Sequence, residues 1–176
     1  MLRGVEAAPR LGAGRPATRL DVQRLFEKMQ ALGDMDPKAR EGIRAKLLVA
    51  AAPAGKVVVY RGERSDAAYF ILKGSVGVGY LKEDEYVILN YLQPGELFGE
   101  VAALTGAART ATVIAEEDSE LLVIPARVLR QLAAQFERLR QELFTIMAQR
   151  LSQIEVPLGS RLDQESLRDL RTTATP

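Results

Sequence analysis

The sequence predicts an α+β fold, in which an N-terminal pair of helices and a long C-terminal helix flank an antiparallel β-roll of the jelly-roll-like barrel type. Between residues 57 and 124, short runs of β-branched and aromatic residues alternate with glycines and charged turns, which is typical of a roll or barrel. On both sides of that region, apolar residues recur at helical spacing. The length of 176 residues, with 47% hydrophobic content, fits one globular domain with appendages.

Two residue types are missing from the chain, and their absence narrows the function. Without cysteine there is no disulfide framework, no thiolate nucleophile and no Fe–S ligand. Without histidine the chain lacks the commonest general base and metal ligand. We therefore expect no enzyme, no metal site and no cofactor. The net charge of +1 predicts no dominant electrostatic field that would attract nucleic acid or an anionic membrane.

Residues 1–18 contain arginine, proline and glycine without a hydrophobic period, and we expect a disordered basic leader there. They lack an apolar run of signal-peptide length, and no run of about 18 to 20 apolar residues elsewhere could span a membrane. A cytoplasmic protein is the simplest expectation.

Residues 19–52 are expected to form two helices that pack outside the β core. The first, over residues 20–32, has apolar residues on one face, and Gly33 is placed to cap its end. Asp36 and Pro37 then supply the N-cap and the first position of a second helix, through about residue 50.

Residues 53–124 are predicted to form the β-roll, with strands at 57–60, 69–72, 76–80, 86–92, 110–115 and 120–124. Gly77 and Gly79 alternate with larger residues in one of these strands. That pattern fits either a face left open for a ligand or a sharply coiled strand.

The stretch 94–113 is the candidate binding segment. Pro94 and Gly95 indicate a turn, and at Gly99 the backbone can approach a ligand closely. A helical turn over 101–104 would point its free N–H groups at an anion beside that glycine. Arg109 can present its planar fork to two phosphate oxygens, while the acceptor Glu100 fits there only if it meets hydroxyl donors. A phosphate beside a hydroxyl-bearing ring indicates a nucleotide.

Residues 98–104, which read Phe-Gly-Glu-Val-Ala-Ala-Leu, and residues 109–113, Arg-Thr-Ala-Thr-Val, resemble the phosphate-binding cassette of the cyclic nucleotide-binding domain family. The similarity extends to residues 69–76 and covers roughly residues 20–154. It implies that Glu100 accepts from the ribose 2′-hydroxyl and that Arg109 binds the cyclic phosphate.

The resemblance also implies the rest of the pocket. The backbone of Gly99, Val101 and Ala102, the Thr110 hydroxyl and the Ala111 amide would complete the phosphate site. The apolar residues near Val87 and Leu89 would form the wall against the purine.

Residues 125–157 are predicted to form a hinge and a long helix, whose apolar residues are spaced 3, 4, 3, 4, 3: Leu129, Leu132, Phe136, Leu139, Leu143 and Ile146. After this seam, Met147, Leu151 and Ile154 drift to another face. In the resembling family this helix closes over the base as a lid and often forms a dimer seam; a helix simply docked on the roll is the alternative.

Val156 to Gly159 should end that helix, and residues 158–176 are expected to be a short tail with one short helix over 162–171. Family members that act as transcription factors continue with a helix-turn-helix of several dozen residues, whereas about 20 residues remain here. No direct DNA binding by this chain is expected.

Domain 19–157 is therefore predicted to be a sensor that binds a 3′,5′-cyclic nucleotide without catalysis, with cyclic AMP favoured over cyclic GMP, and signals through its C-terminal helix. One alternative is a nucleotide-independent interaction module, against which the intact Glu100 and Arg109 count. The other is the sensor part of a larger transcription regulator, channel or transporter.

Overall fold

The structure is a computed structural model that describes residue 11 and residues 14–64 and 66–158, with only the backbone described at 150–158. The helices are α1 (Arg19–Lys28), the short 3₁₀ helix η1 (Gln30–Leu32), α2 (Pro37–Arg44), α3 (Glu100–Thr105), α4 (Ala126–Gln135) and α5 (Glu137–Leu158). The strands are β1 (Arg15–Pro16), β2 (Leu48–Ala52), β3 (Val57–Val59), β4 (Ala67–Lys73), β5 (Val76–Lys82), β6 (Glu85–Leu92), β7 (Leu97–Phe98), β8 (Thr112–Ala115) and β9 (Ser119–Pro125).

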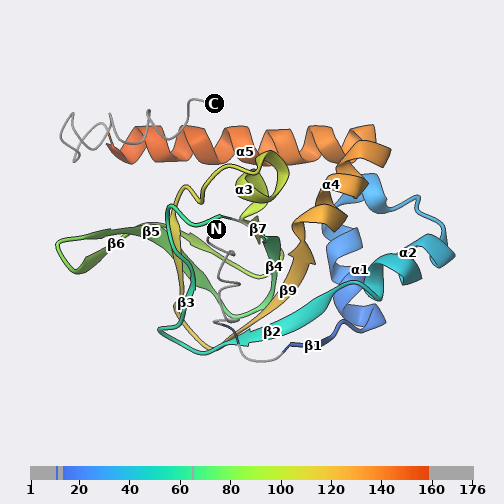
Figure 1. Ribbon diagram of the computed structural model, residues 1–176, viewed down its shortest axis with the longest axis horizontal. Coiled ribbons are helices and arrows are strands. Elements are labelled where there is room, and N and C mark those ends of the chain that lie inside the picture. Colours follow the sequence, from blue (N-terminus) through green and yellow to red (C-terminus); the bar gives the residue numbers. More distant parts are fainter. Residues whose placement is uncertain (1–10, 12–13, 65, 159–176) are drawn as a thin grey trace, which may run out of the picture.

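The strands form two antiparallel sheets, which confirms the predicted β-roll. One sheet has the order β1-β2-β9-β4-β7 and the other the order β3-β8-β5-β6. In Figure 1 the helices α1, α2 and α4 gather at one end of the roll, and the β5–β6 hairpin extends from the opposite end.

Strand β4 is buried on both faces and separates the two halves of the core. Its side chains alternate, so that Phe70 packs with the flanking helices while Tyr69 and Ile71 face the interior of the roll. This double burial explains why β4 reads as a nearly continuous apolar run.

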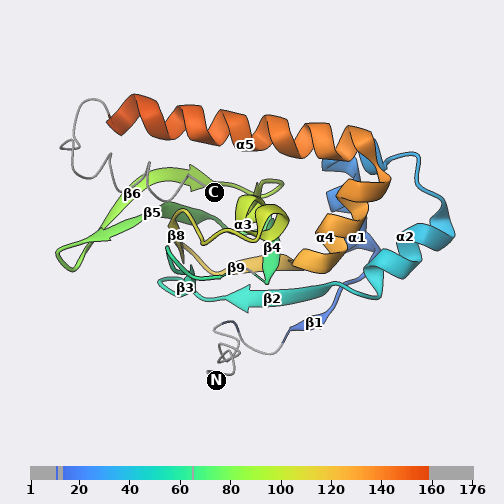
Figure 2. The same ribbon diagram turned by 45° about the horizontal axis from the view of Figure 1, so that its top comes forward.

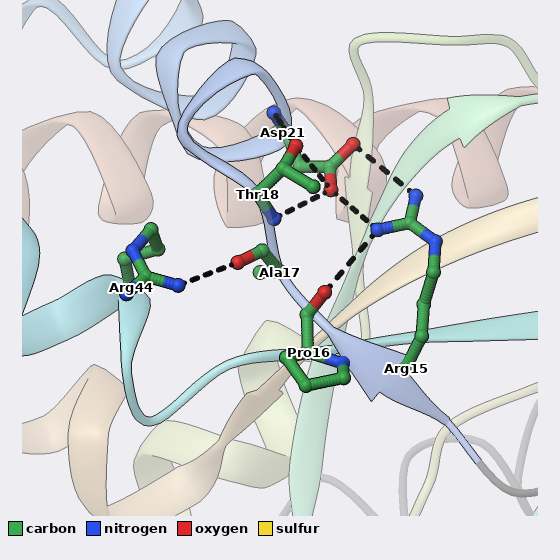
Figure 3. A network of polar contacts seen from close by, with 6 residues as sticks. All are labelled: Arg15, Pro16, Ala17, Thr18, Asp21 and Arg44. Carbon is green, nitrogen blue, oxygen red and sulfur yellow. Dashed lines mark hydrogen bonds and ion pairs between the residues drawn. The ribbon is translucent and has the colours of Figure 1, made fainter.

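The prediction of a disordered leader is wrong for the part of residues 1–18 that the structure describes. Arg15 and Pro16 form β1, which pairs with β2, and Ala17 is buried. Thr18 caps α1 through a capping box with Asp21, and Arg15 Nη1 donates to Asp21 Oδ2 over 2.8 Å (Figure 3). These interactions depend on partners distant in sequence, which composition does not reveal. Residues 1–10, 12 and 13 lie outside the described residues.

The predicted second helix ends at Arg44 rather than near residue 50. The residues that follow form β2, which pairs antiparallel with β9 and places Val49, Ala50 and Ala52 in the core. Alanine favours helices intrinsically, so the local preference misled the prediction and strand pairing overrode it. The first predicted helix is likewise divided, because α1 ends at Lys28 and η1 follows.

The long C-terminal helix is present as α5, and a break precedes it, because Phe136 has an extended backbone (φ −117°, ψ 100°) between α4 and α5. The predicted seam packs inside the protein: Leu129, Leu132, Leu139 and Leu143 belong to the core beside the five-stranded sheet. The Ala31 amide donates to Glu142 Oε1 over 3.0 Å and ties α5 to η1. Figures 1 and 2 show α5 running along one side of the molecule past α3.

Helix α5 continues through Pro157 to Leu158, and the expected tail helix lies outside the described residues.

The alternating glycines of β5 support the coiled-strand alternative. A β-carbon on Gly79 would lie 1.8 Å from the Val87 carbonyl oxygen, and one on Gly77 would lie 2.5 Å from Glu116 Oε1. The pairing of β5 with β6 shifts register between Val78 and Gly79. The glycines therefore allow neighbouring groups to approach the strand closely, and those groups fill the space beside both glycines.

Candidate functional site

The predicted binding segment has the order strand, glycine, helix, loop, strand. Gly99 follows β7 and precedes α3 in the left-handed conformation (φ 77°), which explains the need for glycine there. The following loop continues to Thr112, where β8 begins, so Thr110 and Ala111 lie in the loop and not in the predicted strand.

Arg109 returns across this loop to Gly99, as the sequence predicted. A β-carbon on Gly99 would lie 2.4 Å from Arg109 Nη1, so the guanidinium occupies the space that any larger residue would fill. The arginine is only 6% exposed, and neither Nε nor Nη1 has a hydrogen-bond partner among the described residues. A buried charge with unpaired donors is costly, and an anion with two acceptor oxygens would satisfy it.

The surroundings of Arg109 shift the pKa of its guanidinium. Burial lowers the pKa of the guanidinium, while Tyr69, Asp66 and Glu63 act in the opposite direction. The guanidinium carbon lies 5.5 Å from the centroid of the Tyr69 ring, within the range of a cation–π contact. Because arginine keeps its proton at neutral pH, the site presents a fixed positive charge.

Backbone hydrogen bonds hold Arg109 in place from both sides. Its N–H donates to the Glu63 carbonyl over 2.7 Å, and its carbonyl accepts from the Gly62 N–H over 2.8 Å. Arg64 and Ala108 form an adjoining antiparallel bridge. The loop between β3 and β4 therefore fixes the backbone from which the guanidinium extends.

Glu100 is the first residue of α3, and its side chain is enclosed, with 1% exposed. Carboxylates are rarely so buried unless they interact with donors or cations. Ala102 is also buried, whereas Val101 and Ala111 are half-buried and Thr110 is exposed. The predicted phosphate-site residues thus occupy one continuous segment from Gly99 to Ala111, while their individual roles stay predictions.

Val87 and Leu89, the predicted wall against the purine, are half-buried residues of β6. Val87 pairs with Tyr80 of β5, on the opposite face from the pair of Ile88 and Gly79. Val78, which shares the face of Tyr80, packs against the cluster inside the roll. This alternation assigns Val87 to the inner face, the face that Tyr69 also lines.

Tyr69 is the residue that sequence reasoning missed. Its ring stacks on that of Phe98, with centroids 5.1 Å apart and planes at 18°, and it also lies beside the guanidinium of Arg109. The sequence marked Tyr69 only as a strand residue, because the contact arises from the pairing of β4 with β7. An aromatic residue in a strand carries no local signal for such a contact.

The comparison with family models matches residues 50–136 to the cyclic nucleotide-binding domain. The chain belongs to the cyclic nucleotide-binding domain family. The matched residues include the whole cassette and the strands around it, so the recognition made from residues 98–113 is confirmed.

Relatives and solved structures agree with this family. The cyclic AMP receptor protein of Thermus thermophilus is 32% identical over 108 residues, which cover 60% of this chain and 50% of that protein. A cyclic nucleotide-binding domain from Methylobacillus flagellatus superimposes with a TM-score of 0.66 and 19% identity, covering 86% of this chain and 90% of that one. The latter supports the fold alone. The chain spans about half the length of the receptor proteins that it matches.

The same domain occurs within an enzyme among the relatives. The lysophospholipase nte1 of Aspergillus oryzae is 28% identical over 110 residues, which are 61% of this chain and 7% of that protein. The cyclic nucleotide-binding family is regulatory, so this chain carries a regulatory domain. Among the helices that the structure describes, none has the length and apolarity needed to cross a membrane.

Proposed function

We propose that this domain is a cytoplasmic sensor that binds a 3′,5′-cyclic nucleotide at Arg109 and transmits occupancy through α4 and α5. The observation that carries the proposal is the guanidinium of Arg109, which is buried beside Gly99 with two nitrogens unpartnered among the described residues. A cyclic phosphate is a monoanion with two exocyclic oxygens, which matches the donor fork of arginine.

The enclosed Glu100 supports the same ligand. In this proposal its carboxylate accepts a hydrogen bond from the ribose 2′-hydroxyl, a donor that lies beside the cyclic phosphate in such a nucleotide. Inorganic phosphate lacks a sugar hydroxyl, so a carboxylate at the same site would repel it. The pair of Arg109 and Glu100 therefore favours a nucleotide over a simple anion.

Cyclic AMP is the proposed ligand in preference to cyclic GMP. The match to a protein named cyclic AMP receptor protein supports it. Thr110 is exposed and offers a hydroxyl that could favour guanine, so the preference is tested directly by competition between the two nucleotides. A preference of at least about tenfold for cyclic GMP would overturn this part of the proposal.

Transmission of the signal is proposed to begin at α3, which contacts both α4 and α5. Nucleotide bound beside Gly99 would touch the start of α3, and the helix would pass a displacement to the break at Phe136. The ligand can act this way only if it binds one arrangement of α4 and α5 better than another.

A homodimer through α5 is proposed on a different face from the predicted seam. Leu139 and Leu143 are buried within the protein, but Phe144 is 63% exposed. From this residue onward the apolar positions are spaced 3, 4, 3 and 4, which is the heptad spacing of a coiled coil: Phe144, Met147, Leu151, Ile154 and Leu158. No part in DNA binding is proposed for the described residues.

The deciding experiment is isothermal titration of cyclic AMP and cyclic GMP into protein that has been denatured and refolded to remove carried-over nucleotide. Charge-assisted hydrogen bonds predict that Arg109→Ala weakens binding by about 10-fold to 150-fold. Arg127→Ala, which removes an equal charge from an exposed position of α4, serves as the matched control and should bind as the wild type does. Equal affinity for the wild type and Arg109→Ala, or no heat with either nucleotide, would move the function to an interaction module on the same fold.

A further inference from the structure

A cavity of about 650 Å³ is lined by residues of α1 and α2 and by Gly33. These two helices lie at the end of the molecule away from the β5–β6 hairpin (Figure 1). Clefts that hold organic groups typically measure about 300 to 1,000 Å³ and combine apolar walls with a few polar groups. This cavity has a volume in that range, but its lining holds more charged than apolar side chains. Its apolar lining is Val22, Phe26 and Pro37, and its charged lining is Arg19, Glu27, Arg40, Glu41 and Arg44.

The carboxylates of the lining are already engaged. Arg44 Nε donates to Glu41 Oε1 over 2.9 Å and to Oε2 over 3.0 Å. The same arginine donates through Nη1 to the Ala17 carbonyl over 2.9 Å, as Figure 3 shows. Glu27 Oε1 accepts from the Gln23 amide over 2.8 Å. Arg44 and Glu41 therefore largely neutralise each other.

Arg40 differs from the other charged residues of the lining. Its guanidinium carbon lies 5.0 Å from the centroid of the Phe26 ring, and its Nη2 donates to the Gly33 carbonyl. Its Nε is buried and has no hydrogen-bond partner, and no ion pair to Arg40 is found among residues 14–64 and 66–149. Arg40 thus supplies a positive charge that the side chains described in the structure leave without an ion pair.

We propose that this cavity receives an acidic segment of a partner protein, with a carboxylate bound to Arg40 and a neighbouring apolar side chain against Phe26 and Val22. A guanidinium stacked on an aromatic ring keeps its orientation and presents planar donors that match a carboxylate.

The charge around the cavity favours a segment with several acids. Arg44 and Glu41 offset each other on α2, so the positive charges of Lys38 and Arg40 remain on this helix. Arg19 adds a side chain that is 90% exposed, with its Nε 3.9 Å from the nearest Glu41 oxygen. A chain with successive carboxylates would meet both the half-buried Arg40 and this exposed rim.

The proposed site is separate from the cassette. None of the residues that line the cavity belongs to the segment from Gly99 to Ala111 or to β6. Binding of the acidic segment can therefore be measured without nucleotide, and failure of either proposal leaves the other standing.

The test is an NMR titration of the ¹⁵N-labelled full chain with a capped peptide of sequence Leu-Glu-Glu-Leu-Glu-Glu-Leu. A peptide with glutamine in place of every glutamate and sodium acetate at matched carboxylate concentration are the controls. The expected result is a set of shifts confined to the α1 and α2 amides and the Arg40 Nε–H, seen with the acidic peptide and far weaker with either control. Shifts mapping elsewhere, no shift at millimolar peptide, or equal shifts with acetate would overturn the proposal.

Two variants separate Arg40 from general electrostatic attraction. Arg40→Gln is expected to weaken peptide binding about tenfold, because it removes a charge-assisted hydrogen bond. Lys38→Gln removes the same charge from an exposed position of α2 outside the cavity lining and should change affinity less than about twofold. An equal loss in both variants would refute a defined site. If Arg40→Gln does not fold, two other measurements still test the proposal. One is the map of shifts in the wild-type protein. The other is a titration of Arg40→Glu with a peptide that carries lysine in place of glutamate.

Discussion

At the scale of single residues, the contact between Gly99 and Arg109 shows why the candidate site requires glycine at position 99. Gly99 needs glycine for two separable reasons, its positive φ and the guanidinium that occupies the place of a β-carbon. Gly106, which ends α3 with φ 71°, has only the first requirement, because nothing lies within 4 Å of its β-carbon position. The two glycines therefore form a matched pair.

Gly99→Ala and Gly106→Ala are both expected to lower stability by about 1 to 2 kcal/mol, the cost of a left-handed conformation for an L-residue. Only Gly99→Ala is expected to weaken nucleotide binding strongly, because its methyl group displaces the end of the flexible Arg109 side chain. Urea unfolding gives the first quantity and calorimetric titration the second. Equal binding by the two variants would show that the position of Arg109 does not depend on Gly99.

At the scale of the secondary-structure elements, the start of α1 shows how a terminal segment is ordered. Asp21 accepts hydrogen bonds from Arg15 and from the backbone and side chain of Thr18 (Figure 3). Burial acts to raise the pKa of Asp21, but the donors, with Arg15 foremost, together lower it below its ordinary value. The capping box thus couples the stability of this end to protonation.

The lowered pKa of Asp21 predicts a specific pH dependence. Its stabilisation is fully present above the unfolded pKa of about 3.9 and is lost as pH falls through the lower folded pKa. Asp21→Asn should therefore cost about 1 kcal/mol at pH 7, and the difference from wild type should shrink between about pH 5 and pH 2. Urea unfolding across this range measures it, with the exposed Asp34→Asn as control. A difference that grows toward acid would contradict the assignment.

The elements also show where local sequence was sufficient. The strands from β3 to β6 follow alternation and turn residues that act over a few positions, so their prediction was largely correct. Strand β2 and the break at Phe136 were missed, since neither has a local marker. Pairing with β9 makes residues 48–52 a strand, and the path of the chain around the core divides α4 from α5.

At the scale of the whole molecule, the proposed function predicts that α5 moves when nucleotide binds. A chain without cysteine allows two introduced cysteines to carry unique spin labels, and Lys73 on β4 and Ala148 on α5 are exposed positions for them. The distance distribution between the labels is expected to shift with saturating cyclic AMP and to stay unchanged with Arg109→Ala. Identical distributions with and without nucleotide in the otherwise wild-type protein would rule out movement of α5.

The proposed dimer is a second property of the whole molecule. Phe144→Glu places a charge on the exposed face of α5 and is expected to shift the protein toward monomer in sedimentation velocity, because coiled-coil seams exclude charge. Leu81→Glu, at the comparably exposed Leu81 of β5, is the control and should leave association unchanged. A wild-type monomer at all concentrations, or a Phe144→Glu dimer, would exclude this seam.

The sequence by itself determined the class of fold and the family and indicated the candidate binding segment, because the glycines, the acid and the arginine of the cassette lie within one short stretch. The tertiary structure decided which apolar stripe of α5 is buried, that Tyr69 lies beside Arg109, and that Arg40 has no ion pair among the side chains it describes. The physical reason is the distance along the chain over which each effect acts. Turn chemistry and periodicity act between near neighbours, whereas burial and unpaired charge depend on segments that only the folded chain brings together.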